Sequence, residues 1–159
     1  MIDNLIVKAG KNALEIIRDG GFDWNRVSVY YGSASGPRWL VTGGFDLTLL
    51  EQGCLGRNRA VLLAGASSGA WRFSAWPQPE PVKCYLALRQ AYIEARYQRK
   101  DTPQTVQHSL TKIINRYLEE DAIPFALGNR KYRLAIITAR ARKLAASETP
   151  WLQKTGLGL

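Results

Sequence analysis

One short stretch of the sequence has the residue types and spacing of a nucleophilic site. Gly65-Ala66-Ser67-Ser68-Gly69 follows the pattern Gly-x-Ser-x-Gly and comes directly after the apolar run 60–64. In a tight turn from a strand to a helix, such a serine takes up a strained backbone conformation that raises its Oγ toward a ligand. The flanking glycines leave room for neighbouring backbone, and the first N–H groups of the helix can stabilise an oxyanion. The pattern therefore predicts Ser67 as a nucleophile, with a plain tight turn as the alternative.

A second loop of small residues, Gly32-Ser33-Ala34-Ser35-Gly36, also lies between a predicted strand and a predicted helix. Its consecutive backbone N–H groups suit half of an oxyanion hole or a phosphate cradle. The pattern G-x-x-x-x-G-K-[ST] occurs nowhere in the chain, which argues against a nucleotide P-loop. Taken alone, this loop also fits an ordinary helix start.

The apolar pattern predicts the elements that position these loops. Runs at 27–31, 60–64 and 132–138 predict three strands, and the continuous apolar middle run predicts burial on both faces. Strands that alternate with helices predict an α/β fold with three layers, in which helices cover both faces of a mainly parallel sheet. The expected helices are one that begins near residue 9 and is closed by Gly20-Gly21, one from Pro37 to about Gln52, one after the elbow that stops near Pro77, and two over 80–98 and 103–120.

Composition limits the class of protein. The 159 residues are 46% hydrophobic, which suits one globular domain and excludes intrinsic disorder. Cys54 and Cys84 form no CxxC pair and His108 is the single histidine, so we expect no disulfide framework, no metal site and no cofactor. The chain shows no secretory signal and no apolar run of about 20 residues, so a cytoplasmic protein is expected.

The net charge of +9 is concentrated in the second half of the chain. Residues 81–143 carry thirteen bases and five acids, whereas residues 1–80 are close to neutral. A basic surface attracts nucleic acid, anionic lipid headgroups or acidic substrates, and charge alone does not choose among them.

Three segments, 31–40, 65–72 and 91–97, resemble the patatin-like phospholipase family, and within it a bacterial-type branch. The resemblance runs from about residue 8 to the last residue, and it implies one patatin-like domain over 1–159. It implies hydrolysis of lipid acyl esters by a phospholipase or esterase, through an acyl-enzyme on Ser67. The family's run of three glycines falls here on Ala34-Ser35-Gly36. The other roles implied are oxyanion donors at the backbone of Ser35, Gly36 and Ser68, a basic loop residue at Arg38, and elbow glycines at Gly65 and Gly69.

The resemblance also implies a catalytic aspartate that this sequence does not supply. In the family, an aspartate well downstream of the serine, followed by glycine, takes the serine proton. The one Asp-Gly here, Asp19-Gly20, lies upstream and fits a helix end, and neither Asp101 nor Asp121 precedes a glycine. The tail 151–159 resembles the middle of a longer family member. We therefore expect an N-terminal portion of the domain, without the aspartate and with catalysis impaired by about 10²–10⁴-fold or more.

Two other functions remain open. A Ser-His-Asp triad requires His108, which the helical pattern places off the apolar stripe of helix 103–120, with Asp101 before it. A non-enzymatic basic module that binds an anionic lipid surface or nucleic acid is the second. Tyr132 and Trp151 could stack on bases in such a module. Its cations would be those around the third strand, namely Arg130, Lys131, Arg133, Arg140, Arg142 and Lys143.

The tryptophans near the elbow and the two cysteines are expected to pack in the core: Trp39, Trp71, Trp76, Cys54 and Cys84.

Overall fold

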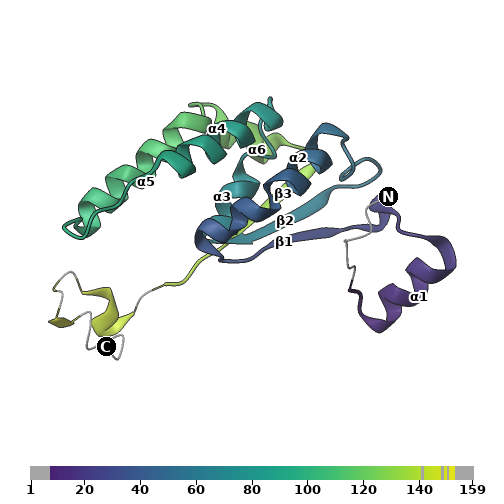
Figure 1. Ribbon diagram of the computed structural model, residues 1–159, viewed down its shortest axis with the longest axis horizontal. Coiled ribbons are helices and arrows are strands. Elements are labelled where there is room, and N and C mark those ends of the chain that lie inside the picture. Colours follow the sequence, from purple (N-terminus) through teal and green to yellow (C-terminus); the bar gives the residue numbers. More distant parts are fainter. Residues whose placement is uncertain (1–7, 141, 148, 150, 153–159) are drawn as a thin grey trace.

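A three-stranded parallel sheet organises the chain. The computed structural model describes residues 8–140, 142–147, 149 and 151–152, so most of the tail 151–159 lies outside the described residues. Strands β1 (Val29–Gly32), β2 (Val61–Ala66) and β3 (Tyr132–Ile137) pair in the order β1-β2-β3 (Figure 1). Gly32 lies opposite Gly65, which brings the ends of the first two strands into register. The predicted α/β class with a parallel sheet is confirmed.

Six α-helices and three 3₁₀ helices are found in the described residues. The expected helix from Pro37 is split into a 3₁₀ helix and an α-helix at the pair Gly43-Gly44, where helix propensity is low. The short helix α6 was missed by the sequence analysis, and the helix predicted over 80–98 ends four residues earlier. The helices are α1 (Lys11–Gly20), η1 (Trp24–Arg26), η2 (Gly36–Thr42), α2 (Gly43–Glu51), α3 (Ser68–Ser74), α4 (Pro81–Glu94), α5 (Pro103–Tyr117), α6 (Ala122–Gly128) and η3 (Lys143–Ala146).

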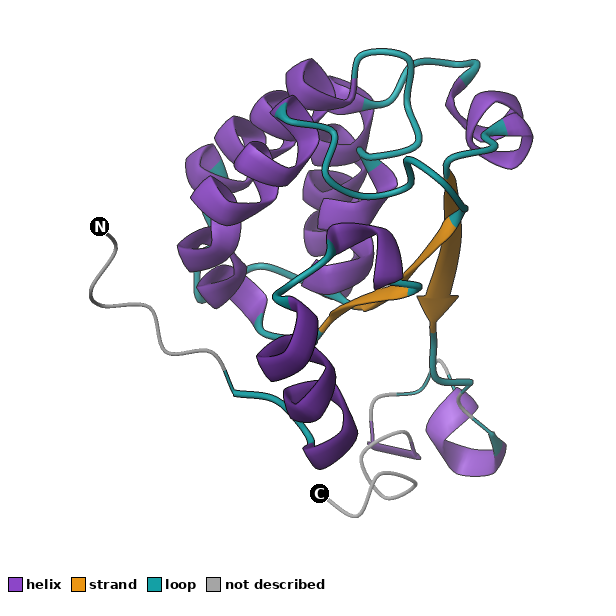
Figure 2. Cartoon of the chain, turned by 90° about the vertical axis from the view of Figure 1, so that its right-hand side faces the viewer, coloured by secondary structure: helices purple, strands orange, loops and turns teal. Residues whose placement is uncertain are grey.

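Helices α2 to α6 lie over one face of the sheet (Figures 1 and 2). The strand order never reverses, and right-handed crossovers that move in one direction leave all their connections on the same side. On the other face Val29, Tyr31 and Leu62 are 51%, 57% and 38% exposed, and α1 buries none of its residues. The expected second helical layer is therefore absent from the described part of the chain. The prediction that the middle strand is buried on both faces was also wrong.

The core fills the space between the sheet and the helical layer. Leu63 of β2 is fully buried there, beside Trp76 and Tyr85. Trp39 is also buried and makes edge-to-face contacts with Tyr85 and Tyr92. The core role expected of the tryptophans is confirmed for Trp39 and Trp76, whereas Trp71 is only partly buried against the core. The structure also buries Cys54 and half-buries Cys84.

None of the helices in the residues that the structure describes has the length and apolarity needed to cross a bilayer.

Candidate active site

Ser67 lies at a sharp elbow between β2 and α3. Its backbone has φ 51° and ψ −122°, a region that residues other than glycine rarely occupy. The cause is local, because β2 ends at Ala66 and α3 begins at Ser68, so the chain changes direction within one residue. Such strain gathers at functional sites when the surrounding structure holds it in place. Ser67 thus has the backbone geometry that its predicted role as a nucleophile requires.

Two glycines hold this elbow against the ends of the strands. A Cβ atom added to Gly69 would lie 2.1 Å from the carbonyl oxygen of Gly32, and one added to Gly65 would lie 2.5 Å from the backbone nitrogen of Ala70. Both neighbours are backbone atoms, so no side-chain rotation could relieve the overlap. Glycine at 65 and 69 therefore lets α3 approach β1 and β2 closely, and this approach places Ser67 beside the loop that follows β1.

The loop after β1 meets the elbow through a hydrogen bond. The backbone N–H of Ser35 donates to Ser68 Oγ at 3.1 Å, and the two hydroxyl oxygens lie 3.4 Å apart. The two predicted halves of the oxyanion hole are therefore adjacent. This bond occupies the Ser35 N–H, so the backbone N–H groups of Gly36 and Ser68 remain as the candidate oxyanion donors. Gly36 has φ 53°, a conformation that favours glycine at this turn.

Arg38 takes part in the loop through its backbone. Its N–H donates to the carbonyl oxygen of Ser35 at 3.2 Å and closes the turn that begins η2. The Arg38 side chain is exposed. Arg38 therefore lies where the resemblance puts the basic loop residue, with its charge directed to solvent.

A largely apolar cavity of about 440 Å³ opens beside Ser67. Its volume and lining suit a hydrocarbon chain, because apolar side chains dominate while few polar groups converge on it. Burial raises the pKa of Tyr117 to about 12, and its hydroxyl oxygen lies 2.8 Å from Ser74 Oγ, so Tyr117 stays protonated at neutral pH. The other residues of the wall are Ala70, Trp71, Ile114, Leu118, Ile136, Ile137 and Thr138.

The described residues place no general base at the cavity beside Ser67. Among the residues that the structure describes, none that lines this cavity carries a carboxylate or an imidazole. The carboxylate of Asp101 accepts a hydrogen bond from the Gln98 N–H at 2.6 Å, and Asp121 is the residue before α6. His108 is exposed on α5, off its buried stripe, as expected. Within the described part of the chain, the geometry brings neither a dyad aspartate nor a triad histidine to the serine.

Behind the elbow lies a buried polar network that the sequence analysis missed. Asp46 of α2 is fully buried and accepts hydrogen bonds of 2.6 Å from the hydroxyls of Tyr30 and Tyr85. Arg72 of α3 pairs with it, with Nε 3.1 Å from Oδ2. Arg72 also donates to Thr42 Oγ1 at 3.0 Å. The network thus ties the elbow helix to β1, η2, α2 and α4.

Burial controls the protonation of this network. Desolvation raises the pKa of Asp46, whereas Arg72 and the two tyrosine hydroxyls oppose that rise. Desolvation, followed by the nearby Asp46 carboxylate, also raises the pKa of Tyr30 and of Tyr85, so both remain neutral donors. The sequence shows an acid, Asp46, in an apolar helix and a base, Arg72, five residues after Ser67. Nothing in the sequence indicates that the two form a pair.

The basic residues predicted around the third strand are spread along it and beyond both of its ends. Arg130 and Lys131 precede β3, whereas Arg140 follows its other end, so the sheet separates them. The suggestion that Tyr132 stacks on nucleic-acid bases was wrong, because this side chain is buried in the core. Trp151 is exposed.

No family model, curated protein or solved structure matches the chain in the three comparisons made. The resemblance to patatin-like phospholipases therefore stays a prediction.

Proposed function

We propose that the chain is a patatin-like serine acyl hydrolase, which cleaves lipid esters through an acyl-enzyme on Ser67. The observation that carries this proposal is the strained backbone of Ser67, with φ 51°, at a turn from a strand to a helix. Close glycine–backbone contacts hold that turn, and an apolar cavity opens beside it. Together they provide a raised nucleophile, neighbouring N–H donors and room for an acyl chain.

The reaction follows from these positions. Ser67 Oγ attacks the ester carbonyl carbon, and the N–H groups of Gly36 and Ser68 stabilise the resulting oxyanion. Collapse of the intermediate breaks the ester C–O bond and releases the alcohol, which takes up a proton. Water then attacks the acyl-enzyme, releases the fatty acid and restores Ser67.

The lack of a base among the described residues of the cavity limits the rate of this reaction. Since no described side chain at the cavity accepts the Ser67 proton, it passes to water, and we expect a rate about 10²–10⁴-fold below that of a complete site. The proposal requires no cofactor. It includes a cytoplasmic location with peripheral contact to an anionic membrane surface.

Acylation by an activated ester tests the proposal. After incubation with p-nitrophenyl octanoate, the intact mass of the chain should increase by one octanoyl group, and Ser67→Ala should abolish the increase. Ser109→Ala is the matched control, because Ser109 does not line this cavity and its hydroxyl donates to the Thr105 carbonyl oxygen. Ser109→Ala should acylate like the unmodified chain. Equal acylation of Ser67→Ala and the unmodified chain would remove Ser67 as the nucleophile.

The alternative function is a non-enzymatic basic module. It is favoured by the absence of a base beside Ser67 in the described residues. A chain of this kind would show no acylation while it still bound anionic vesicles or oligonucleotides.

A further inference from the structure

Three segments lie at the end of the molecule that carries Ser67. Segments 33–42 and 138–140 follow the carboxyl ends of β1 and β3, and segment 93–102 comprises the last two residues of α4 and the turn between α4 and α5. In Figure 1 these segments all lie on the left of the molecule. Segments 33–42 and 93–102 are linked through α4, because the ring of Trp39 packs edge-to-face on Tyr92, at 5.5 Å between centroids. We call the three segments the cationic rim, for the charges described below.

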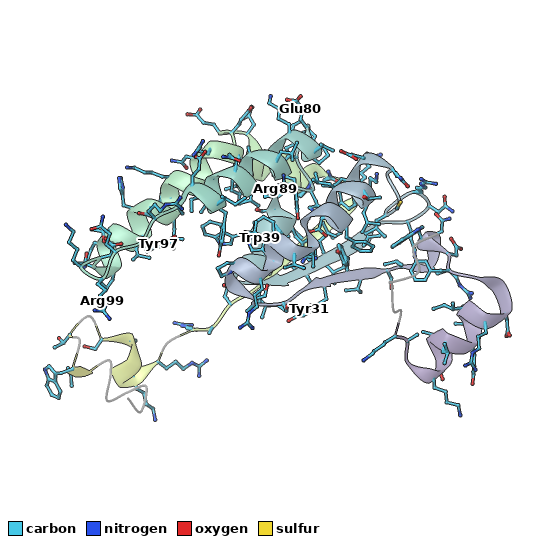
Figure 3. The ribbon with its side chains drawn as sticks, viewed as in Figure 1. Tyr31, Trp39, Glu80, Arg89, Tyr97 and Arg99 are labelled. Atoms are coloured by element: carbon cyan, nitrogen blue, oxygen red, sulfur yellow. The ribbon has the colours of Figure 1, made fainter. Side chains whose placement is uncertain are left out.

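The α4–α5 turn projects past the Ser67 cavity. Ile114 of α5 lines the cavity, and α5 begins eleven residues earlier at Pro103. At 1.5 Å per residue, the start of the helix lies about 16 Å from the cavity wall. Figure 3 shows Tyr97 and Arg99 at this outer tip, away from the sheet. The cavity is lined by Ser67, directly after β2, and by Thr138 of the rim, so the cavity and the rim lie at the same end of the sheet.

The cationic rim has a surplus of positive charge. It holds five bases and two acids. The two acids leave a surplus of three positive charges (five bases minus two acids), and Glu94 also pairs with Arg116 of α5, outside the rim. The five bases, all exposed, are Arg38, Arg96, Arg99, Lys100 and Arg140.

Apolar side chains stand exposed among these cations. Val41 is 88% exposed beside Arg38, and Tyr97 is 52% exposed beside Arg99. Cations meet the phosphates of an anionic membrane, while apolar and aromatic side chains enter the region below the headgroups. A nucleic-acid surface offers phosphates without an apolar layer for Val41, so the combination favours lipid.

We propose that the cationic rim docks the protein on an anionic lipid surface, with the Ser67 cavity facing the bilayer. Arg99 and Lys100 contact headgroup phosphates, and Val41 and Tyr97 enter the interface. The inference extends the proposed function by naming the surface that presents the ester. Docking itself does not use the Ser67 hydroxyl, so the two proposals can fail separately.

Vesicle flotation with matched charge reversals tests the docking surface. The intact chain and its Ser67→Ala variant should both float with vesicles of phosphatidylglycerol and phosphatidylcholine, and not with phosphatidylcholine alone. Each cation at such a surface contributes about fivefold in partitioning, so Arg99→Glu/Lys100→Glu should lower partitioning by at least about 25-fold. Val41→Asp should lower it without removing a cation. The control, Arg26→Glu/Arg130→Glu, makes the same charge change on exposed residues that precede β1 and β3, at the opposite end of the strands.

Three results would overturn the docking surface. Equal losses of partitioning in the two double variants would indicate attraction by net charge alone. Equal flotation with both kinds of vesicle would exclude recognition of anionic headgroups. Binding of a fluorescent oligonucleotide that depends on Arg99 and Lys100, with no flotation, would assign the rim to nucleic acid. A chain that floats as expected but shows no acylation of Ser67 would refute the proposed hydrolase and leave the docking surface standing.

Discussion

Gly69→Ala tests whether the close approach of α3 to β1 positions the elbow. The new Cβ would lie 2.1 Å from the Gly32 carbonyl oxygen, and real Cβ atoms essentially never approach another heavy atom closer than 3.0 Å, so the helix end must withdraw by roughly 1 Å. Overpacking of this kind costs about 1–3 kcal/mol of folding free energy. In a chain of this size, each kcal/mol lowers Tm by about 2–4 °C. Urea and thermal unfolding followed by circular dichroism measure the loss.

Gly44→Ala is the matched control for this prediction. Gly44 lies in α2, and a Cβ added there meets no atom within 4 Å. The same substitution should therefore raise stability by about 0.5–1 kcal/mol, because alanine is the better helix former. If Gly69→Ala were as stable as Gly44→Ala, the close contact between α3 and β1 could not be what holds the elbow.

Three further predictions concern the network, the oxyanion loop and alkaline pH. Arg72→Met leaves Asp46 buried without its charge partner and should lower the free energy of unfolding, measured with urea, by about 3–5 kcal/mol. Adding Asp46→Asn should lower it by less than the sum of the two single losses. Ser68→Ala removes the acceptor of the Ser35 N–H, so acylation of Ser67 by p-nitrophenyl octanoate should slow even at temperatures well below Tm. An unchanged acylation rate would contradict the claim that this hydrogen bond positions the oxyanion loop. Because burial raises the pKa of Tyr85 above its unfolded value of about 10, its contribution to stability should be lost as the pH rises beyond about 10. Unfolding free energies measured across that range should fall less at alkaline pH in Tyr85→Phe than in the unmodified chain. An equal fall in both would refute this role of Tyr85.

Local sterics made part of the fold and the site predictable from the sequence. The glycine pair at 20–21 marks the end of α1, where Gly21 has φ 75° and its N–H donates to the Ile17 carbonyl oxygen. The Gly-x-Ser-x-Gly pattern led to the elbow because only small residues permit the observed contact between Gly69 and Gly32. These features depend on neighbours in the chain or on one close contact, so residue types suffice to find them.

The tertiary arrangement of the helices and of distant charged residues could not be predicted from the sequence. Helices on one face follow from the strand order β1-β2-β3, which no local pattern encodes. The pairing of Asp46 with Arg72 joins residues far apart in the chain, and each alone looked like an ordinary charge. The basic residues around β3 read as one patch in the sequence, although Lys131 and Arg140 flank opposite ends of the strand.

The most direct test of the central claim is the site of covalent labelling by a fluorophosphonate. The probe phosphonylates a nucleophilic serine irreversibly, so labelling accumulates over a long incubation even where attack by Ser67 is slow. Peptide mass mapping should place the adduct on Ser67, and the Ser67→Ala chain should remain unlabelled while Ser109→Ala labels normally. An adduct on another residue, or undiminished labelling of Ser67→Ala, would contradict the assignment of Ser67 as the nucleophile.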